Sequence, residues 1–428
     1  MLRYHIWTVG CQMNRADSAK LAGGLSRLGW EETERPGDAD LVVLNTCAVR
    51  AGAEERTFGK LGVLRRLKQQ RPELRIALMG CMVGRRHDDL VRRFPFVDVF
   101  AQPQHFDDVL AALGVDPADL GGEFWPETVG RQEGPTAFVP VVEGCDKFCT
   151  YCIVPYRRGR ERSRPVEEIL HEVAGHVRFG VREVTLLGQT VEAYGHDLPV
   201  RADLGDLMRA LHDIPGLDRV RFLTSYPRDM TPRIIEAVAE LPKVCECFSL
   251  PVQAGDDRVL ERMRRGYTLA EFRQRLDQVR RAMPEVGITT DVIVGFCGET
   301  DEEFRGTLRL LEEARFDKVH VAAYSPRPGT IAARKMEDDV LDAVKHERLL
   351  RVEALQERIA AEINAALRGQ VRDVLVEGSK DGRWFGRTRT GKLVHFTGPA
   401  RVGETVPVRI DETTAWSLRG AAMVGAAV

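Results

Sequence analysis

The segment Gly144–Pro165 decides the fold, and it reads GCDKFCTYCIVPYRRGRERSRP. Its cysteines, Cys145, Cys149 and Cys152, follow a strand predicted over Phe138–Val142, so the loop leaving that strand can bring three thiolates together. A cysteine-only 4Fe–4S cluster uses four thiolates, and no fourth cysteine lies nearby. The spacing therefore predicts a cluster with one iron open to an external ligand. The alternative is a structural zinc site, which needs a fourth cysteine or histidine close by.

Six strand-like runs alternate with helical patterns around this segment, between about Thr136 and Asp338. Six β/α units are too few for an eight-fold barrel, so a partial barrel and a doubly wound sheet both fit. A long charged helix is predicted next, over Leu341–Leu367. The six runs are Phe138–Val142, Glu183–Leu187, Arg221–Thr224, Cys247–Val252, Thr289–Val294 and Lys318–Ala323.

Strands and helices also alternate from Met1 to about Gly130, which predicts an open α/β sheet. The run DLVVLNT at Asp40–Thr46 is nearly all apolar, as expected of a buried parallel strand. Pro117–Gly134 is rich in glycine, proline and acidic residues, which indicates a linker. The other predicted strands are Tyr4–Val9, Arg75–Met79 and Phe96–Ala101, and the helices are Asn14–Leu28 and Gly52–Gln70.

The last part of the chain, from Arg368 to Val428, has the pattern of a small all-β barrel. Its short alternating runs are separated by turns that contain glycine. We thus expect three domains, at residues 1–125, 135–367 and 368–428. The predicted strands of the barrel are Val371–Val376, Trp384–Thr388, Leu393–Phe396 and Thr405–Ile410.

A second group of cysteines stands at strand ends: Cys11, Cys47 and Cys81 each directly follow a predicted strand. Because strand carboxyl ends converge on one edge of an open α/β sheet, these cysteines are expected to meet and to hold a second cluster. The alternative is that they are apolar thiols that end buried strands. Ordinary buried thiols are expected at the remaining cysteines, Cys245, Cys247 and Cys297.

The composition is that of a globular protein, with 43% apolar and 29% charged residues in a chain of 428. The start of the chain contains Arg3 and His5, so no secretory signal is expected, and no run approaches the ~20 apolar residues of a membrane helix. Nine cysteines without export signals indicate a reducing cytosol. The net charge of −2 leaves only local patches to attract nucleic acid. Nothing in the sequence demands more than a monomer.

Two basic stretches are candidates for RNA contact. A run of five arginines after the cluster loop can clamp a phosphate backbone, with a solvated lead-in before Pro165 as the alternative. In the C-terminal barrel, cations interleave with aromatic residues, which fits phosphate contact and base stacking, with a core position as the alternative for Phe385. The first stretch comprises Arg157, Arg158, Arg160, Arg162 and Arg164. The second comprises Lys380, Arg383, Trp384, Arg387, Arg389 and Lys392.

Over its whole length the chain resembles the methylthiotransferases, a branch of the radical S-adenosylmethionine enzymes. Gly144–Pro165 resembles the core of that family, and residues from about Arg368 resemble a TRAM domain, a small RNA-binding barrel. The MiaB type, the tRNA-2-methylthio-N(6)-dimethylallyladenosine synthases, is the most similar branch, because of the basic run and the Gly188–Val191 block. The other matching blocks are Gly10–Asn14, Asn45–Arg50, Gly80–Met82, Tyr194–Gly195, Ser249–Gln253, Thr290–Thr300 and Tyr324–Thr330.

The resemblance implies the cofactors and their ligands. It places a radical-generating 4Fe–4S cluster, with S-adenosylmethionine on its open iron, on Cys145, Cys149 and Cys152. An auxiliary 4Fe–4S cluster that carries or donates sulfur is implied at Cys11, Cys47 and Cys81. The cofactors then carry out the radical generation and the sulfur donation, which explains why the sequence shows no acid–base dyad.

The S-adenosylmethionine pocket is expected at residues in the cluster loop and at strand ends, with plain turn chemistry as the alternative for each. Cys297 stands where the family usually has proline, and Ala254–Asp256 stands where a Ser-Gly-Ser run is usual, so the detail of this pocket departs from the family. The expected pocket residues are Tyr151, Gln189, Gln253, Gly295 and Gly298.

The resemblance implies an enzyme that adds a methylthio group to carbon 2 of N(6)-dimethylallyladenosine beside the tRNA anticodon. Its implied partners are tRNA, through the anticodon loop, and an electron-donor protein. A second reading keeps the chemistry but changes the substrate to a threonylcarbamoyl-adenosine tRNA or a ribosomal-protein aspartate. A third reading is an iron–sulfur RNA-binding protein without turnover.

Overall fold

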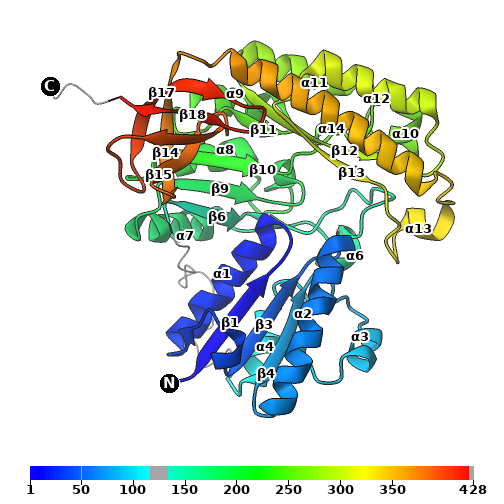
Figure 1. Cartoon of the computed structure of the whole chain (residues 1–428), viewed down its shortest axis with the longest axis vertical. Helices are drawn as coiled ribbons and strands as arrows, with labels where there is room; N and C mark the ends of the chain where they lie inside the picture. The colour runs from blue at the N-terminus through cyan, green and yellow to red at the C-terminus, as the bar shows by residue number, and fades with distance from the viewer. Residues whose placement is uncertain (50, 116–133, 424–428) are drawn as a thin grey trace.

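The structure, a computed structural model, describes residues 1–49, 51–115 and 134–423. It contains an N-terminal α/β domain, a central partial barrel and a C-terminal β-barrel, which confirms the expected fold class (Figure 1). Of the predicted linker Pro117–Gly134, all but Gly134 lies outside the described residues. The domain boundaries of 1–125, 135–367 and 368–428 stay predictions. Within the described ranges, no helix is both long and apolar enough to span a bilayer.

The N-terminal domain is a parallel sheet with helices on both faces. Its elements are β1 (Arg3–Thr8), α1 (Gln12–Arg27), β2 (Glu31–Glu32), η1 (Pro36–Asp38), β3 (Leu41–Thr46), α2 (Ala51–Gln70), β4 (Arg75–Gly80), α3 (Asp88–Arg93), β5 (Val99–Ala101) and α4 (Phe106–Ala112). The strand order is β2-β1-β3-β4-β5, and central β3 is buried at all six positions, as its apolar run predicts. Side chains of α1 and α4 pack on one face, and those of α2 and α3 on the other.

Six parallel strands form the central domain. They are β6 (Thr136–Pro140), β9 (Glu183–Leu187), β10 (Arg219–Leu223), β11 (Cys247–Ser249), β12 (Gly287–Val294) and β13 (Lys318–Ala323). They pair as β6-β9-β10 and β11-β12-β13, and a parallel bridge between Val220 and Val244 joins the two sheets. The spatial order therefore follows the chain order, whereas a doubly wound sheet reverses its order at a switch point. This order selects the partial barrel.

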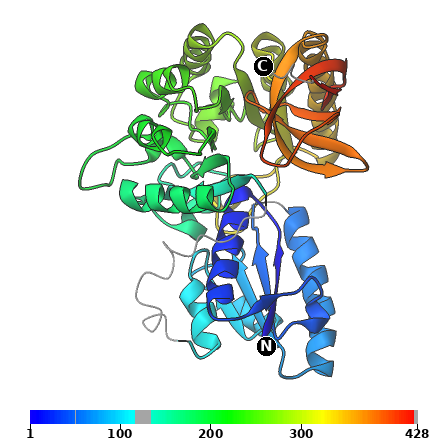
Figure 2. The same ribbon diagram turned by 90° about the vertical axis from the view of Figure 1, so that its left-hand side faces the viewer.

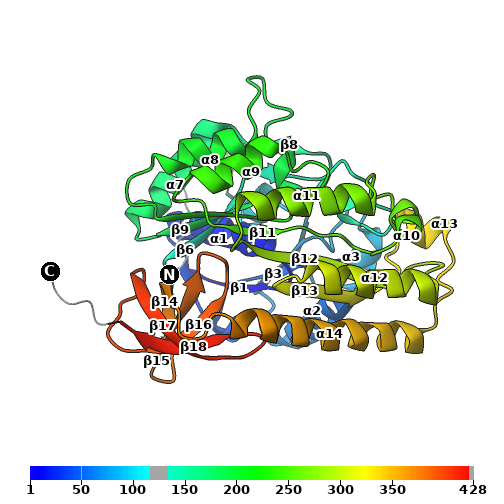
Figure 3. The same ribbon diagram turned by 90° about the horizontal axis from the view of Figure 1, so that it is seen from above.

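Helices cover the outside of the partial barrel, and a two-stranded hairpin flanks the cysteine loop (Figure 3). The hairpin is β7 (Val142–Glu143) with β8 (Arg162–Ser163), and the helices are α6 (Val154–Arg158), α7 (Val166–Arg178), η3 (Val191–Ala193), α8 (Leu204–His212), α9 (Pro232–Glu240), α10 (Asp257–Arg262), α11 (Leu269–Ala282), α12 (Asp301–Ala314), α13 (Ile331–Lys335) and α14 (Asp342–Ala365). The predicted long helix Leu341–Leu367 is α14, two residues shorter at its end.

The C-terminal domain is a closed barrel of five strands, one more than predicted. They are β14 (Val371–Lys380), β15 (Arg383–Thr388), β16 (Leu393–Thr397), β17 (Thr405–Thr413) and β18 (Leu418–Ala422), in the order β14-β15-β16-β18-β17. The fifth strand, β18, reads LRGAA, so it has no β-branched residue and no alternation that would mark it as a strand. Pairing to β16 and β17 on its two sides makes it a strand.

Buried arginines fasten this barrel to the amino ends of the core strands. Arg219, in β10, donates to the carbonyl oxygen of Arg387 at 2.8 Å. Arg221 donates to the carbonyl oxygens of Thr388 and Arg389, both at 2.7 Å, and pairs with Glu183 at 2.9 Å. The barrel therefore lies at the end of the core opposite to the strand ends that carry the cysteine loop (Figure 1).

We expect Arg221→Met to destabilise the protein by about 3–5 kcal/mol, because it leaves the buried Glu183 carboxylate without its 2.9 Å partner. The measurement is the thermal midpoint, together with amide hydrogen exchange in β15, which should speed up. Arg383→Met, at an exposed position in β15, is the control and should leave both unchanged. Equal midpoints for Arg221→Met and the wild type would contradict this account of the docking.

Candidate functional site

The loop with Cys145, Cys149 and Cys152 connects β7 to α6 beyond the carboxyl end of β6. Gly144 starts the loop with a φ of +70°, and a Cβ there would lie 2.0 Å from the carbonyl oxygen of Arg160. Only glycine tolerates both that dihedral and that approach. The sequence therefore bends sharply just before its first cysteine.

Thr150, in the middle of the loop, is held by three hydrogen bonds. Its N–H donates to the carbonyl oxygen of Met263 at 3.0 Å, and its hydroxyl donates to that of Arg262, 112 residues away, at 2.9 Å. Its carbonyl oxygen accepts from the N–H of Ala332 at 2.8 Å. The conformation of the loop is thus set by distant segments of the core.

A buried guanidinium lies beside these thiols. Arg265 places Nη1 3.3 Å from the Sγ of Cys149 and 3.3 Å from the hydroxyl oxygen of Tyr151. Burial and the neighbouring Cys149 together raise the pKa of Cys152 to about 12. A cation next to crowded thiols favours the thiolate, which is the form that binds metal. Arg265 therefore prepares this trio to act as anionic ligands.

Three thiols with a buried cation beside them fit the ligand set of a 4Fe–4S cluster. No group of three His, Cys, Asp or Glu side chains within residues 1–49, 51–115 and 134–423 is arranged around a single metal position. Zinc would draw its sulfurs to ~2.3 Å from a common centre, whereas each thiolate of a 4Fe–4S cluster binds a separate iron. The assignment of the cluster to these three cysteines stays a prediction.

The strand-end cysteines of the N-terminal domain also come together. Cys11 precedes α1, Cys47 follows β3 and Cys81 follows β4, at the carboxyl edge of three neighbouring strands. Burial raises the pKa of Cys81 to about 11; Arg158 lowers it, and both Cys11 and Cys47 raise it. All four groups are therefore close enough to interact. The structure brings the three thiols to one edge, where the strand-end rule places them.

The two cysteine trios face each other across the boundary between the domains. Cys81 packs in one buried cluster with Ile153, the residue directly after Cys152, and with Tyr156 at its edge. Met13 of α1 packs against Leu187 at the end of β9. Figures 1 and 2 show the N-terminal domain beneath the core, with its strands pointing toward the core. One cysteine of the N-terminal trio therefore packs in the same cluster as the residue that follows the other trio.

The arginine run after the loop does not form one surface patch, which corrects the expectation for part of it. The side chain of Arg158 is 1% exposed and pairs with Asp17 at 3.0 Å. Arg164 pairs with Glu172 at 2.7 Å and donates to the carbonyl oxygen of Pro140. Both are held inside because carboxylates from α1 and α7 neutralise them. The positions that remain partly or fully exposed are Arg157, Arg160 and Arg162.

The residues expected to bind S-adenosylmethionine lie at the same carboxyl edge of the core. Tyr151 stands edge-on to Phe296, with ring centroids 6.4 Å apart. Gln189 lies two residues after the end of β9 and is partly buried. Gln253 is buried with a φ of +76°, and it bridges to Val292 in β12. Their role in binding the cofactor stays a prediction.

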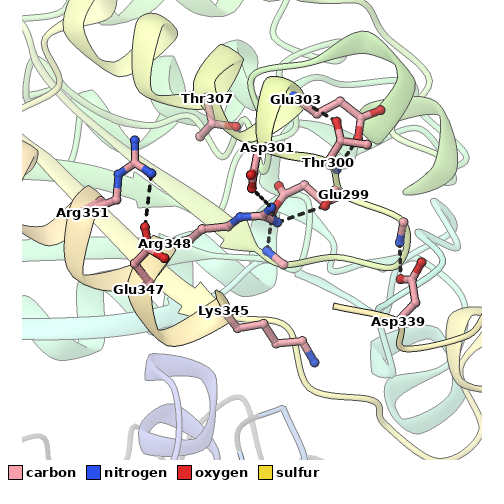
Figure 4. Close-up of polar contacts among 12 residues, drawn as sticks. Glu299, Thr300, Asp301, Glu303, Thr307, Asp339, Lys345, Glu347, Arg348 and Arg351 are labelled. Atoms are coloured by element: carbon pink, nitrogen blue, oxygen red, sulfur yellow. Dashed lines mark hydrogen bonds and ion pairs between the residues drawn. The ribbon is translucent and has the colours of Figure 1, made fainter. Parts of the chain in front are cut away.

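Gly295 and Gly298 lie in the loop after β12, and at Gly295 the structure shows an intramolecular reason for glycine. A Cβ on Gly295 would lie 2.3 Å from the Cγ of Lys345. The N–H of Gly295 donates to Glu299 at 2.6 Å, and Glu299 pairs with Arg348 of α14 at 2.8 Å (Figure 4). The close approach at Gly295 is therefore to α14, and the loop is anchored to that helix.

The cations of the C-terminal barrel divide into two groups. Arg389 pairs with Glu246 at 2.8 Å and Lys392 pairs with Asp317 at 2.5 Å, so carboxylates of the core bind both cations. Their contact with RNA stays a prediction. The remaining predicted residues, Lys380, Arg383, Trp384 and Arg387, are exposed or partly exposed.

The remaining cysteines are placed as ordinary thiols. Burial raises the pKa of Cys245 and Cys247, and the charge of the neighbouring Arg221 lowers it. Cys297 lies within hydrogen-bond reach of Tyr324. The structure gives no sign that they join either trio.

Sequence reasoning missed three residues that the fold brings to the site. Arg265 contacts Cys149, and the hydroxyl of Thr190 lies 3.5 Å from the Sγ of Cys145. Glu192, in η3, is fully buried and accepts from the N–H of Tyr226 at 2.9 Å. Their only local signal was position: Thr190 and Glu192 stand just after a strand end, and Arg265 precedes a glycine.

Three family descriptions match the three parts of the chain. Residues 139–311 match the Radical SAM superfamily. Residues 3–102 match the Uncharacterized protein family UPF0004, and residues 365–423 match the TRAM domain.

Curated relatives match the chain along its length. A tRNA-2-methylthio-N(6)-dimethylallyladenosine synthase from Roseiflexus sp. (strain RS-1) is 50% identical over 98% of this chain and 89% of its own. One from Chloroflexus aurantiacus is 49% identical over 98% of this chain and 91% of its own. Among solved structures, a radical S-adenosylmethionine methyltransferase from Kitasatospora setae has a TM-score of 0.55 at 14% identity, over 78% of this chain and 74% of its own. That likeness concerns the fold alone.

We expect Glu192→Gln to stabilise the protein at pH 8. Burial raises the pKa of Glu192 from 4.5 to about 7, so the folded state holds the proton more tightly than the unfolded state. That stability is present below pH 4.5 and is lost as the pH rises through 7. Glutamine resembles the protonated acid, so the gain at pH 8 is about 3 kcal/mol at most, with little difference at pH 4.5.

Thermal midpoints at the two pH values measure this effect. Glu240→Gln, at an exposed position of α9, is the control and should not change with pH relative to the wild type. A Glu192→Gln protein less stable than the wild type at pH 8 would contradict the prediction.

Proposed function

Because this chain belongs to the family of tRNA-2-methylthio-N(6)-dimethylallyladenosine synthases, we propose that it adds a methylthio group to carbon 2 of N(6)-dimethylallyladenosine beside the anticodon of a tRNA. Its radical S-adenosylmethionine domain implies S-adenosylmethionine and one 4Fe–4S cluster. The second cluster, on Cys11, Cys47 and Cys81, is part of the proposal.

The observation that carries the proposal is the meeting of two cysteine trios at one interdomain site. Cys81 of the N-terminal domain packs against Ile153, which directly follows Cys152 of the other trio. A radical enzyme that transfers sulfur needs the radical source and the sulfur source to reach the same substrate carbon. Two cluster sites at one domain boundary would meet that requirement, whereas distant sites would not.

When bound, the clusters and S-adenosylmethionine supply the electron, the radical and the sulfur. The residues of this chain orient and shield them. Arg265 holds its charge beside Cys149, and Thr190 contacts Cys145 through its hydroxyl. Ile153 and Met82 pack as buried apolar groups between the trios, which keeps water from reactive species.

The tRNA would approach from the faces that keep exposed cations. Arg160 is 76% exposed beside the cluster loop, and Lys380 and Arg383 are exposed on the barrel. Such cations bind a phosphate backbone, and an anticodon loop offers unpaired bases that can leave their stack. An electron-donor protein, a monomeric state and a cytosolic location belong to the proposal as well.

We expect about eight irons per chain in anaerobically reconstituted wild type, since each 4Fe–4S cluster holds four. Cys145→Ala/Cys149→Ala/Cys152→Ala should fall to about four, and so should Cys11→Ala/Cys47→Ala/Cys81→Ala. Iron, sulfide and Mössbauer analysis measure this. Cys245→Ala, which removes a buried thiol outside both trios, is the matched control and should keep about eight. About four irons in the wild type, falling to none in the first variant, would refute the second cluster.

The product assay separates the substrate readings. Reduced protein with S-adenosylmethionine should convert tRNA carrying N(6)-dimethylallyladenosine to its 2-methylthio form, and should leave threonylcarbamoyl-adenosine tRNA unchanged, as nucleoside mass spectrometry would show. Cys11→Ala should lose the product but still form 5′-deoxyadenosine, and Cys145→Ala should lose both. A wild type that forms no 5′-deoxyadenosine would be an iron–sulfur RNA-binding protein without turnover.

A further inference from the structure

A buried arginine from the core domain reaches into the N-terminal cysteine site. Arg158 belongs to α6, only six residues after Cys152, yet its contacts are with α1 of the other domain. Its Nη2 donates to Asn14 at 3.1 Å and to Asp17 at 3.0 Å. Both side chains of the Arg158–Asp17 pair are 1% exposed. This is a fully buried ion pair across the domain boundary.

The same guanidinium is linked to the thiols through Asn14. The Oδ1 of Asn14 accepts from the Nη2 of Arg158 at 3.1 Å and from the Sγ of Cys11 at 3.7 Å. Burial raises the pKa of Cys81, and the charge of Arg158 lowers it. The other terminal nitrogen of Arg158, Nη1, is buried and has no hydrogen-bond partner within the described residues. A buried charged donor without a partner is costly. The structure therefore leaves one buried donor of Arg158 without a partner within the described residues.

An anionic group at the cysteines would account for that free donor. Three thiolates on a 4Fe–4S cluster make a site with net negative charge, and hydrogen bonds to sulfur and nearby charge set cluster potentials. Asp17 contacts Arg158 through Oδ2 alone, and its other oxygen, Oδ1, is buried without a hydrogen-bond partner within the described residues. Reduction adds an electron, so a fixed cation nearby favours the reduced state.

We propose that Arg158 is a positioning residue that the core domain contributes to the auxiliary site, and that its charge raises the reduction potential of the cluster on Cys11, Cys47 and Cys81. The proposal rests on the proposed function for the presence of that cluster. It assigns Arg158 to the auxiliary site rather than to RNA contact. The helix that follows Cys152, α6, thereby supplies a cation to the site of the other cluster.

The test isolates the auxiliary cluster in full-length Cys145→Ala/Cys149→Ala/Cys152→Ala protein and adds Arg158→Gln, Arg158→Lys, Asp17→Asn or Arg164→Gln. Arg164→Gln is the matched control, because Arg164 is in the same segment, is 13% exposed and pairs with Glu172. The readouts are iron content and the midpoint potential from an electron paramagnetic resonance titration. Neither depends on turnover.

Arg158→Gln should reduce the ratio of reduced to oxidised cluster at a fixed potential by about tenfold, which is 59 mV toward negative potential for one electron. Arg158→Lys keeps the charge and should shift much less. Asp17→Asn should shift the potential in the positive direction, because it leaves the arginine unneutralised. Arg164→Gln should not shift it. Opposite shifts of the potential in Arg158→Gln and Asp17→Asn would not arise if Arg158 only supported the fold.

Several outcomes overturn the proposal. One is an unchanged potential in Arg158→Gln with its iron retained. Others are equal shifts in Arg158→Gln and Arg164→Gln, or a negative shift in Asp17→Asn. If both Arg158 variants lose iron, the Asp17→Asn variant decides the test: a positive shift of its potential supports the proposal, and a negative or absent shift overturns it. An absence of iron in the parent triple variant would refute the second cluster itself, which separates failure of the proposed function from failure of this inference.

Discussion

The N-terminal sheet turns its carboxyl edge toward the core, and the rest of the molecule depends on this constraint (Figure 1). In a parallel sheet the loops that leave the strands all emerge on one edge, so residues far apart in the chain meet there. Cys11, Cys47 and Cys81 meet at the edge of one sheet, and the loop of Cys145–Cys152 leaves the edge of the other. Packing of α1 against the end of β9 holds the two edges together.

Bringing cysteines together under burial raises the pKa of their thiols, which opposes the thiolate that binds metal. Each trio has a buried arginine that counteracts this effect. Arg265 lies beside Cys149, and Arg158 lies beside Cys81. A buried guanidinium cannot lose its proton, so its charge stays with the site at any physiological pH. Both cations come from the core domain, which ties the electrostatics of the two sites to one scaffold.

The C-terminal barrel lies at the opposite end of the core strands. Its attachment also depends on buried arginines, which here hold two domains together. Arg219 and Arg221 donate to backbone carbonyl oxygens of the barrel, and Arg389 returns from the barrel to Glu246. These bonds fix the barrel at a set distance and orientation from the cysteine loops. A tRNA that contacts its exposed cations must therefore span the core to reach the proposed reactive site.

The sequence by itself determined the alternation of strands and helices, the cysteine trio of one loop and the strand-end positions of the other. Those features are local, because strand runs and cysteine spacing lie within a few residues of each other. It missed β18, whose strand state comes only from pairing with β16 and β17. It also read Arg158 and Arg164 as surface cations, since a run of arginines looks the same whether water or a carboxylate faces it. Only the tertiary structure decided that Asp17 and Glu172, on α1 and α7, lie opposite them. Partner choice for a buried charge depends on which elements pack together, and that information is not local in the chain.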